Sequence, residues 1–157
     1  MKAYLSGAME FAIDEGAGWR IDITNWLVKH LNHSVYNPVE ESQSLVKKNG
    51  AENYREWKNS DPKKYADFIR ICVDRDIDIV RNHSDYIICL WDENVLKGAG
   101  THAEVTIAYD CKKPVFLINK LPEPDLSGWI MACSSRIFSD FDQLKKYLSE
   151  QYSPVSI

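Results

Sequence analysis

The chain has 157 residues, of which 45% are hydrophobic and 27% are charged, and its formal net charge is −4. This length and composition are typical of one domain with its own hydrophobic core. An acidic balance without a basic run argues against nucleic-acid binding, and no apolar stretch reaches the roughly 18–20 residues that a membrane span needs.

The N-terminus and the cysteines indicate a cytoplasmic protein. Glu10 and Asp14 interrupt the N-terminal stretch before any apolar run is long enough for a secretory signal. Four cysteines are scattered without a C-x-x-C pair: Cys72, Cys89, Cys111 and Cys133. This pattern favours reduced, mostly buried thiols. The four histidines show no metal-ligand spacing, so we expect neither a metal nor an organic cofactor.

The first half of the chain alternates between strand and helix patterns. Strands are expected at residues 2–7 and 33–38, and helices at residues 17–32 and 61–82. Asn37-Pro38 is expected to close the second strand. Asp61 and Pro62 supply an N-cap and a first position for the long helix. Residues 39–60 are polar and predict no definite element.

The second half continues the alternation, with strands expected at residues 85–91, 113–118 and 135–138 and helices at residues 101–111 and 140–150. The runs DYIICLW and KPVFLI are apolar throughout, as strands buried on both faces should be. We therefore predict that residues 1–157 form a single flavodoxin-like domain, an α/β fold in which helices cover both faces of a doubly wound, mostly parallel five-stranded sheet. Ligands bind such sheets beyond the carboxyl ends of the strands.

One carboxylate, Glu104, lies at that edge in the stretch KGAGTHAEVTIA (97–108). By spacing alone, Thr101 and Glu104 form a capping box in which each side chain bonds the other's backbone N–H. Gly98 and Gly100, ahead of a helix N-terminus, are an alternative cradle for a phosphate. The third glycine of the dinucleotide fingerprint and the lysine of a P-loop are both absent.

Several blocks of the sequence, taken together, resemble the nucleoside 2-deoxyribosyltransferase family and its relatives, the deoxynucleoside-monophosphate N-glycosidases. In chain order the blocks are Tyr4-Leu5-Ser6-Gly7-Ala8-Met9, Tyr36-Asn37-Pro38, Arg75-Asp76 ahead of Ser84-Asp85-Tyr86-Ile87-Ile88, Gly100-Thr101-His102-Ala103-Glu104 with Ala108, and Lys113-Pro114-Val115. The resemblance implies a homo-oligomeric enzyme, working without a cofactor, that cleaves the N-glycosidic bond of deoxynucleosides.

The resemblance also implies roles for three side chains. Glu104 would attack the anomeric carbon of the sugar and hold it as a covalent ester, which suits a carboxylate kept ionised at a helix start. Asp76 would donate a proton to the base or contact a sugar hydroxyl. Tyr4 would position the Glu104 carboxylate. From the residues alone, Asp76 is a solvated helix residue in an acidic run, and the alternative for Tyr4 is a strand residue that fills the core.

Substrate contacts are expected from eight further residues: Ser6, Gly7, Arg20, Asp92, Gly98, Gly100, Thr101 and Asp125. Arg20, with Ser6 and the backbone N–H groups of Gly16 and Gly18 at a helix start, would bind a 5′-phosphate, or it is a solvated helix residue. The family's acidic base contact falls on Gly98, so Asp92 would have to reach in from farther back in the loop. Asp125 lies in the segment that completes a neighbouring subunit's site in several family members.

Four functions remain open at this stage. Transfer of a deoxyribosyl group from a nucleoside to another free nucleobase leads. Hydrolysis of nucleoside 5′-monophosphates would use the same carboxylate, as would cleavage of the nicotinamide–ribose bond of NAD. A nucleotide-binding module without catalysis, with Glu104 only a cap, is the alternative from a different class.

Overall fold

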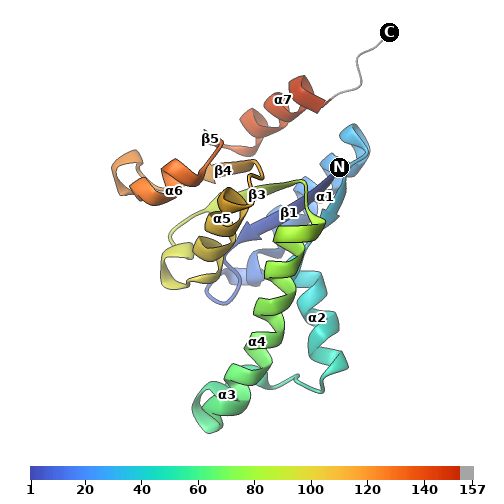
Figure 1. Ribbon diagram of the computed structural model, residues 1–157, viewed down its shortest axis with the longest axis vertical. Coiled ribbons are helices and arrows are strands. Elements are labelled where there is room, and N and C mark those ends of the chain that lie inside the picture. The colour runs from blue at the N-terminus through green and yellow to red at the C-terminus, as the bar shows by residue number, and fades with distance from the viewer. Residues whose placement is uncertain (153–157) are drawn as a thin grey trace.

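Five parallel strands form one sheet in the computed structural model, which describes residues 1–152 (Figure 1). The strands are β1 (Lys2–Gly7), β2 (Ser34–Tyr36), β3 (Tyr86–Trp91), β4 (Val115–Asn119) and β5 (Arg136–Phe138). Their order across the sheet is β2-β1-β3-β4-β5, and every neighbouring pair is parallel. This order is the flavodoxin-like one, which confirms the predicted doubly wound α/β fold.

Helices connect the strands. They are α1 (Ala17–Leu31), α2 (Pro38–Lys48), α3 (Tyr54–Ser60), α4 (Pro62–Asp78), α5 (Gly100–Asp110), α6 (Gly128–Cys133) and α7 (Phe141–Tyr152). A π-helical turn, Ile79–His83, continues α4, and short 3₁₀ turns lie at Ile13–Gly16, Val95–Lys97 and Glu123–Asp125. No helix among residues 1–152 combines the length and the apolarity needed to cross a membrane.

Side chains alternate along each strand, so both faces of the sheet carry apolar side chains. Helices cover both faces. Ala3 and Leu5 of β1 belong to a core that α1 and α7 cover. Tyr4 belongs to the opposite core, which α5, α6 and the turn after α4 cover. The strands β3 and β4 supply both cores, which explains why they are apolar at almost every position.

The main departure from the sequence prediction is the polar stretch 39–60, most of which is helical in α2 and α3. Asn37 caps α2 by accepting a hydrogen bond from the backbone N–H of Val39 at 3.1 Å, with Pro38 in the first turn. The Asn-Pro pair closes the strand β2, which ends at Tyr36, as predicted, and it also starts a helix that was not predicted. Asp61 caps α4, as predicted. The helix α6 was not predicted.

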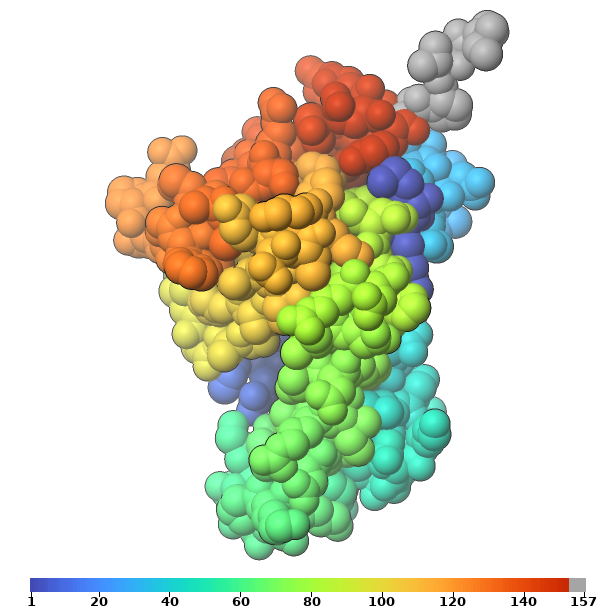
Figure 2. Space-filling view, in the orientation of Figure 1, coloured from blue at the N-terminus to red at the C-terminus, as the bar shows by residue number. Residues whose placement is uncertain are grey.

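Helices α2 and α3 and the N-terminal half of α4 extend away from the sheet as an arm (Figure 1). The arm has an aromatic interior, in which the Phe68 ring lies 5.0 Å from that of Tyr54 and 6.2 Å from that of Trp57, measured between ring centroids. Figure 2 shows the surface where the arm meets the sheet: the loop after β1 (blue) lies between the loop after β3 (yellow) and α4 (green).

Candidate active site

The Glu104 carboxylate is held by two hydroxyl groups from the central part of the sheet. The Tyr4 hydroxyl donates a hydrogen bond to its Oε1 atom at 2.7 Å, and the Ser6 hydroxyl donates to Oε2. Tyr4 and Ser6 are alternate residues of β1, so both point to the face that α5 covers. Both side chains are fully buried, so water cannot replace either donor.

The predicted capping box between Thr101 and Glu104 is wrong. The helix α5 begins at Gly100, with Ala99 as its N-cap, and no side chain caps it. The helix thus starts two residues earlier than a capping box at Thr101 requires, and Glu104 falls in its second turn. Its carboxylate is therefore free of the backbone and bonds to β1.

Burial raises the pKa of the Glu104 carboxyl above its ordinary value. The hydrogen bonds from Ser6 and Tyr4 oppose this rise, the nearby charge of Asp76 adds to it, and the charge of Arg20 opposes it. The pKa of Tyr4 is raised well above its ordinary value by burial and by the charge of Glu104, so Tyr4 stays a protonated donor. The site therefore balances the cost of a buried charge against two donors that stabilise it.

A second carboxylate, Asp76, lies in the last turn of α4. Arg75 donates to both of its oxygen atoms, from Nε at 2.9 Å and from Nη2 at 3.1 Å. The Tyr36 hydroxyl donates to Asp76 at 3.5 Å, and the Tyr36 ring stacks on Tyr4 with centroids 5.4 Å apart. Burial raises the pKa of Asp76, and the hydrogen bonds and charge of Arg75 oppose the rise.

Both carboxylates line one cavity of about 250 Å³ at the carboxyl edge of the sheet. The loop after β1, the loop after β3 and α4 complete its lining: Gly7, Ala8, Met9, Glu10, Phe11, Ile69, Asn94, Val95, Gly98, Ala99, Gly100 and Thr101. A hollow of about 150 Å³ under the arm shares Met9, Glu10, Ile69 and Asp76 with it. Of two hollows of about 530 Å³, one lies at the arm and shares Met9 with the cavity, the other lies at the ends of β4 and β5, and neither contains Glu104 or Asp76.

The structure brings most of the predicted contact residues together. Gly7, Gly98, Gly100 and Thr101 line the cavity beside the two carboxylates. Ser6 lies beneath it, where it bonds Glu104. Arg20, Asp92 and Asp125 do not line the cavity.

Arg20 is fully buried, and its guanidinium donates to five backbone carbonyl oxygens at 2.9–3.5 Å: those of Leu5, Gly7, Ala8, Glu15 and Gly16. The backbone N–H groups of Gly16 and Gly18, expected beside a phosphate, instead donate to the Asp14 carboxylate. The chain's own groups thus fill this proposed phosphate site. Arg20 holds the loop after β1 in place.

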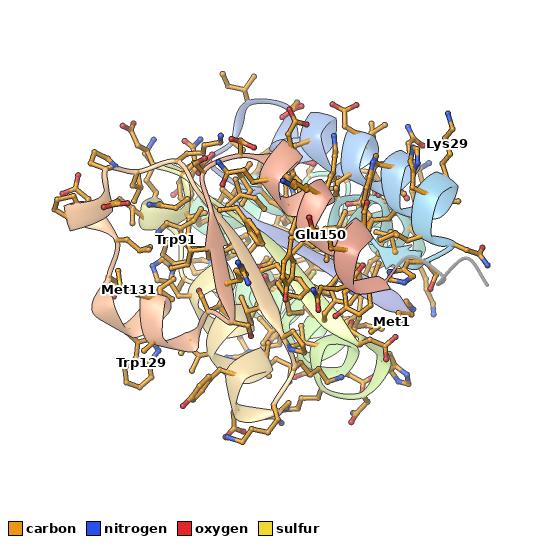
Figure 3. All side chains as sticks on the ribbon, turned by 90° about the horizontal axis from the view of Figure 1, so that it is seen from above. Met1, Lys29, Trp91, Trp129, Met131 and Glu150 are labelled. Carbon is orange, nitrogen blue, oxygen red and sulfur yellow. The ribbon has the colours of Figure 1, made fainter. Side chains whose placement is uncertain are left out.

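Asp92 and Asp125 lie apart from the carboxylate pair. The Oδ1 atom of Asp92 accepts hydrogen bonds from the backbone N–H groups of Asn94 and Val95, which shapes the turn after β3. Asp125 is exposed in a 3₁₀ turn just before α6. In α6, Trp129 is 67% exposed at the outer edge of the molecule (Figure 3). A contribution of Asp125 to a neighbouring subunit remains a prediction.

Residues 1–152 contain no group of three or more His, Cys, Asp or Glu side chains placed to hold a metal ion. The sequence did not predict the roles of two residues that shape the site, Tyr36 and Arg75, which both bond to Asp76. Tyr36 pairs with Tyr4 in the register between β1 and β2, which the sequence does not reveal. Arg75 stood next to Asp76 in a matching block, but neighbours on a helix normally point apart.

Comparison with known proteins shows a similarity of fold. A search of protein-family models and a search of curated protein sequences found no match. Among solved structures, the CMP N-glycosidase BcmB from Clostridium botulinum is similar, with a TM-score of 0.53 and 16% sequence identity. The match covers 95% of this chain and 99% of that chain. The chain therefore shares its fold with a CMP N-glycosidase over nearly its whole length.

Proposed function

We propose that this protein cleaves the N-glycosidic bond of nucleoside 5′-monophosphates, with Glu104 as the nucleophile. The observation that carries the proposal is the Glu104 carboxylate, held by Tyr4 and Ser6 at a cavity that Asp76 also lines. The resemblance of the sequence to the deoxyribosyltransferase family and the fold shared with a CMP N-glycosidase support it.

The reaction proceeds in two displacements at the C1′ atom of the sugar. In the first, a Glu104 oxygen bonds to C1′ while the C1′–N bond breaks, and the leaving base takes the bonding electron pair and a proton from solvent water. In the second, a water oxygen bonds to C1′ and the ester bond breaks, returning its electron pair to Glu104. The water gives up one proton, and the sugar keeps its original configuration.

The surroundings of Glu104 suit this chemistry. A nucleophilic carboxylate must be ionised, and hydrogen bonds from Tyr4 and Ser6 stabilise that form. Because burial raises the pKa of Glu104, the activity should fall as the pH is lowered through that raised value. The same two donors fix the direction from which Glu104 meets C1′.

A specific observation favours monophosphates over nucleosides. The N-terminus of α5 has no side-chain cap, and Gly98, Gly100 and Thr101 at this end line the cavity. The free backbone N–H groups of a helix start bind anions such as phosphate. The helix start would thus bind the 5′-phosphate, the role that was expected of Arg20.

Transfer to a second base is the other candidate, and the same covalent intermediate supports it. A free nucleobase would take the place of water in the second displacement. The hollow under the arm, which shares Asp76 and Ile69 with the main cavity, offers adjoining space for such an acceptor.

The test is release of free base, measured by chromatography, from ribo- and deoxynucleoside monophosphates, nucleosides and NAD. Each reaction is repeated with an added free base, whose incorporation into new nucleotide or nucleoside reports transfer. We expect release from monophosphates and its loss in Glu104→Gln. The matched control is Glu93→Gln, an exposed carboxylate in the loop after β3, which should leave turnover unchanged.

Unchanged turnover in Glu104→Gln would refute the proposal. If the protein is a nucleotide-binding module without catalysis, nucleotide would raise its melting temperature, but no base would be released. Release from NAD alone would assign the site to a different substrate.

A further inference from the structure

Arg75 and Asp76, adjacent in the sequence, form a two-pronged ion pair beside the cavity. Consecutive residues of an α-helix point about 100° apart, so both side chains must turn to the same side for Arg75 to reach both oxygens of Asp76. The two side chains are only 18% and 20% exposed. A two-pronged bond between a guanidinium and a carboxylate fixes orientation as well as charge.

Arg75 is itself held from the arm. Its Nη2 atom donates to the hydroxyl of Ser42 on α2 at 3.0 Å. Its Nη1 atom is buried and meets no hydrogen-bond partner within the described part of the chain. The guanidinium therefore serves Asp76 and the arm, and it does not face the cavity as a substrate contact would.

We propose that Arg75 is a positioning residue, which orients the Asp76 carboxylate and keeps it charged so that Asp76 accepts a hydrogen bond from the substrate. This inference rests on the proposed function of the cavity. A charged carboxylate has free lone pairs for an O–H group of the sugar or an N–H group of the base, but it has no proton to give. Asp76 is then an acceptor, and the proton for the leaving base comes from solvent water.

The other groups near Asp76 explain why an arginine is needed there. Across the hollow under the arm, Arg55 and Glu10 are paired with Glu15 and Lys58. The remaining groups come from β2, β1, α5 and α4: Tyr36, Tyr4, Glu104 and Cys72. None of these four is a cation, and a second carboxylate disfavours charge on Asp76. Among them, the Tyr36 hydroxyl stabilises the charged form by one long hydrogen bond of 3.5 Å, whereas Arg75 adds two shorter bonds and a positive charge.

The first test measures the titration of the Asp76 carboxyl group by carbon-13 NMR. In Arg75→Met its pKa should rise by about one pH unit or more, because an opposite charge at hydrogen-bond distance is lost. Arg75→Lys, which retains a charge, should give a smaller rise and covers the case in which Arg75→Met does not fold. The control is Arg70→Met, an exposed arginine on the same helix that pairs with Asp67, and it should change nothing.

The second test measures kcat/KM for base release from a nucleoside monophosphate across pH. In Arg75→Met the acid limb should move to higher pH and kcat/KM near neutral pH should fall about tenfold or more. Asp76→Asn should lower kcat/KM, and in the residual activity that remains, adding Arg75→Met should cause no further shift of the limb.

The sign of the shift decides the role of Asp76. If Asp76 were the proton donor, raising its pKa would extend activity to higher pH. That result, or an Asp76 titration that does not respond to Arg75→Met, would overturn the inference. A wild-type protein that releases no base would instead refute the proposed function and the acceptor role with it, while the NMR titration would still decide whether Arg75 controls the charge of Asp76.

Discussion

Replacing Tyr4 with Phe removes a single hydroxyl group and should weaken the nucleophile. The lost bond is the 2.7 Å hydrogen bond to Glu104, and Tyr4 is 0% exposed, so no solvent replaces the donor. A hydrogen bond to a charged group contributes about 1.5–3 kcal/mol, which corresponds to a loss of about ten- to hundredfold in kcat/KM. Because the hydrogen bond from Tyr4 lowers the pKa of Glu104, its loss should also move the acid limb to higher pH.

The assay is base release by Tyr4→Phe, followed as kcat/KM across pH. The control is Tyr86→Phe, since Tyr86 is also a fully buried strand tyrosine with a hydrogen-bonded hydroxyl, 2.9 Å from His33, but belongs to the core on the other face of the sheet. Tyr86→Phe should lower stability and leave the pH profile in place. A Tyr4→Phe protein with wild-type kcat/KM and an unmoved limb would show that this hydroxyl does not act through Glu104.

Three further predictions concern stability, measured by chemical unfolding. Glu104→Gln should raise the free energy of unfolding at neutral pH, because the folded state holds the Glu104 proton to higher pH than the unfolded chain does. The gain in stability should vanish as the pH falls below about 4.5, the ordinary pKa of a glutamate. A gain that persists at lower pH would show that it does not come from the charge of Glu104. Arg20→Met should lower the free energy of unfolding by about 3 kcal/mol or more, because it leaves buried carbonyl groups without a donor. If stability is unchanged and only the binding of monophosphates is weaker, Arg20 is a phosphate contact after all. Gly16→Ala should destabilise the protein more than Gly50→Ala. Both glycines have a positive φ, +72° and +57°, but only at Gly16 would a Cβ atom lie 2.8 Å from a backbone oxygen. Equal losses of stability in the two variants would mean that the structure relieves this crowding.

The sheet was predictable from the sequence because its central strands are buried on both faces. The apolar runs in β3 and β4 have no other stable place in a protein of this size, and the alternation with helices then determines a parallel sheet. Helices α2 and α3 of the arm were not predictable in the same way. They are largely polar, and aromatic contacts such as that of Tyr54 with Phe68 of α4 form only once the helices pack together.

The candidate site likewise has parts that could be predicted from the sequence and parts that could not. Glu104, Asp76 and Tyr4 were named through a resemblance, and the structure brings them to one site. The role of Arg20 was not predictable, because its partners are backbone carbonyl groups of a loop, which leave no mark in the sequence. The hydrogen bond from Ser6 to Glu104 likewise depends on how β1 packs under α5.

Mass spectrometry of a quenched reaction tests the central claim most directly. Wild-type protein is mixed with a nucleoside monophosphate that it cleaves, stopped with acid during turnover and digested. The account predicts a peptide that carries the sugar phosphate on Glu104, and no such adduct in Glu104→Gln. Base release without any adduct, together with a sugar product of inverted configuration at C1′, would contradict it.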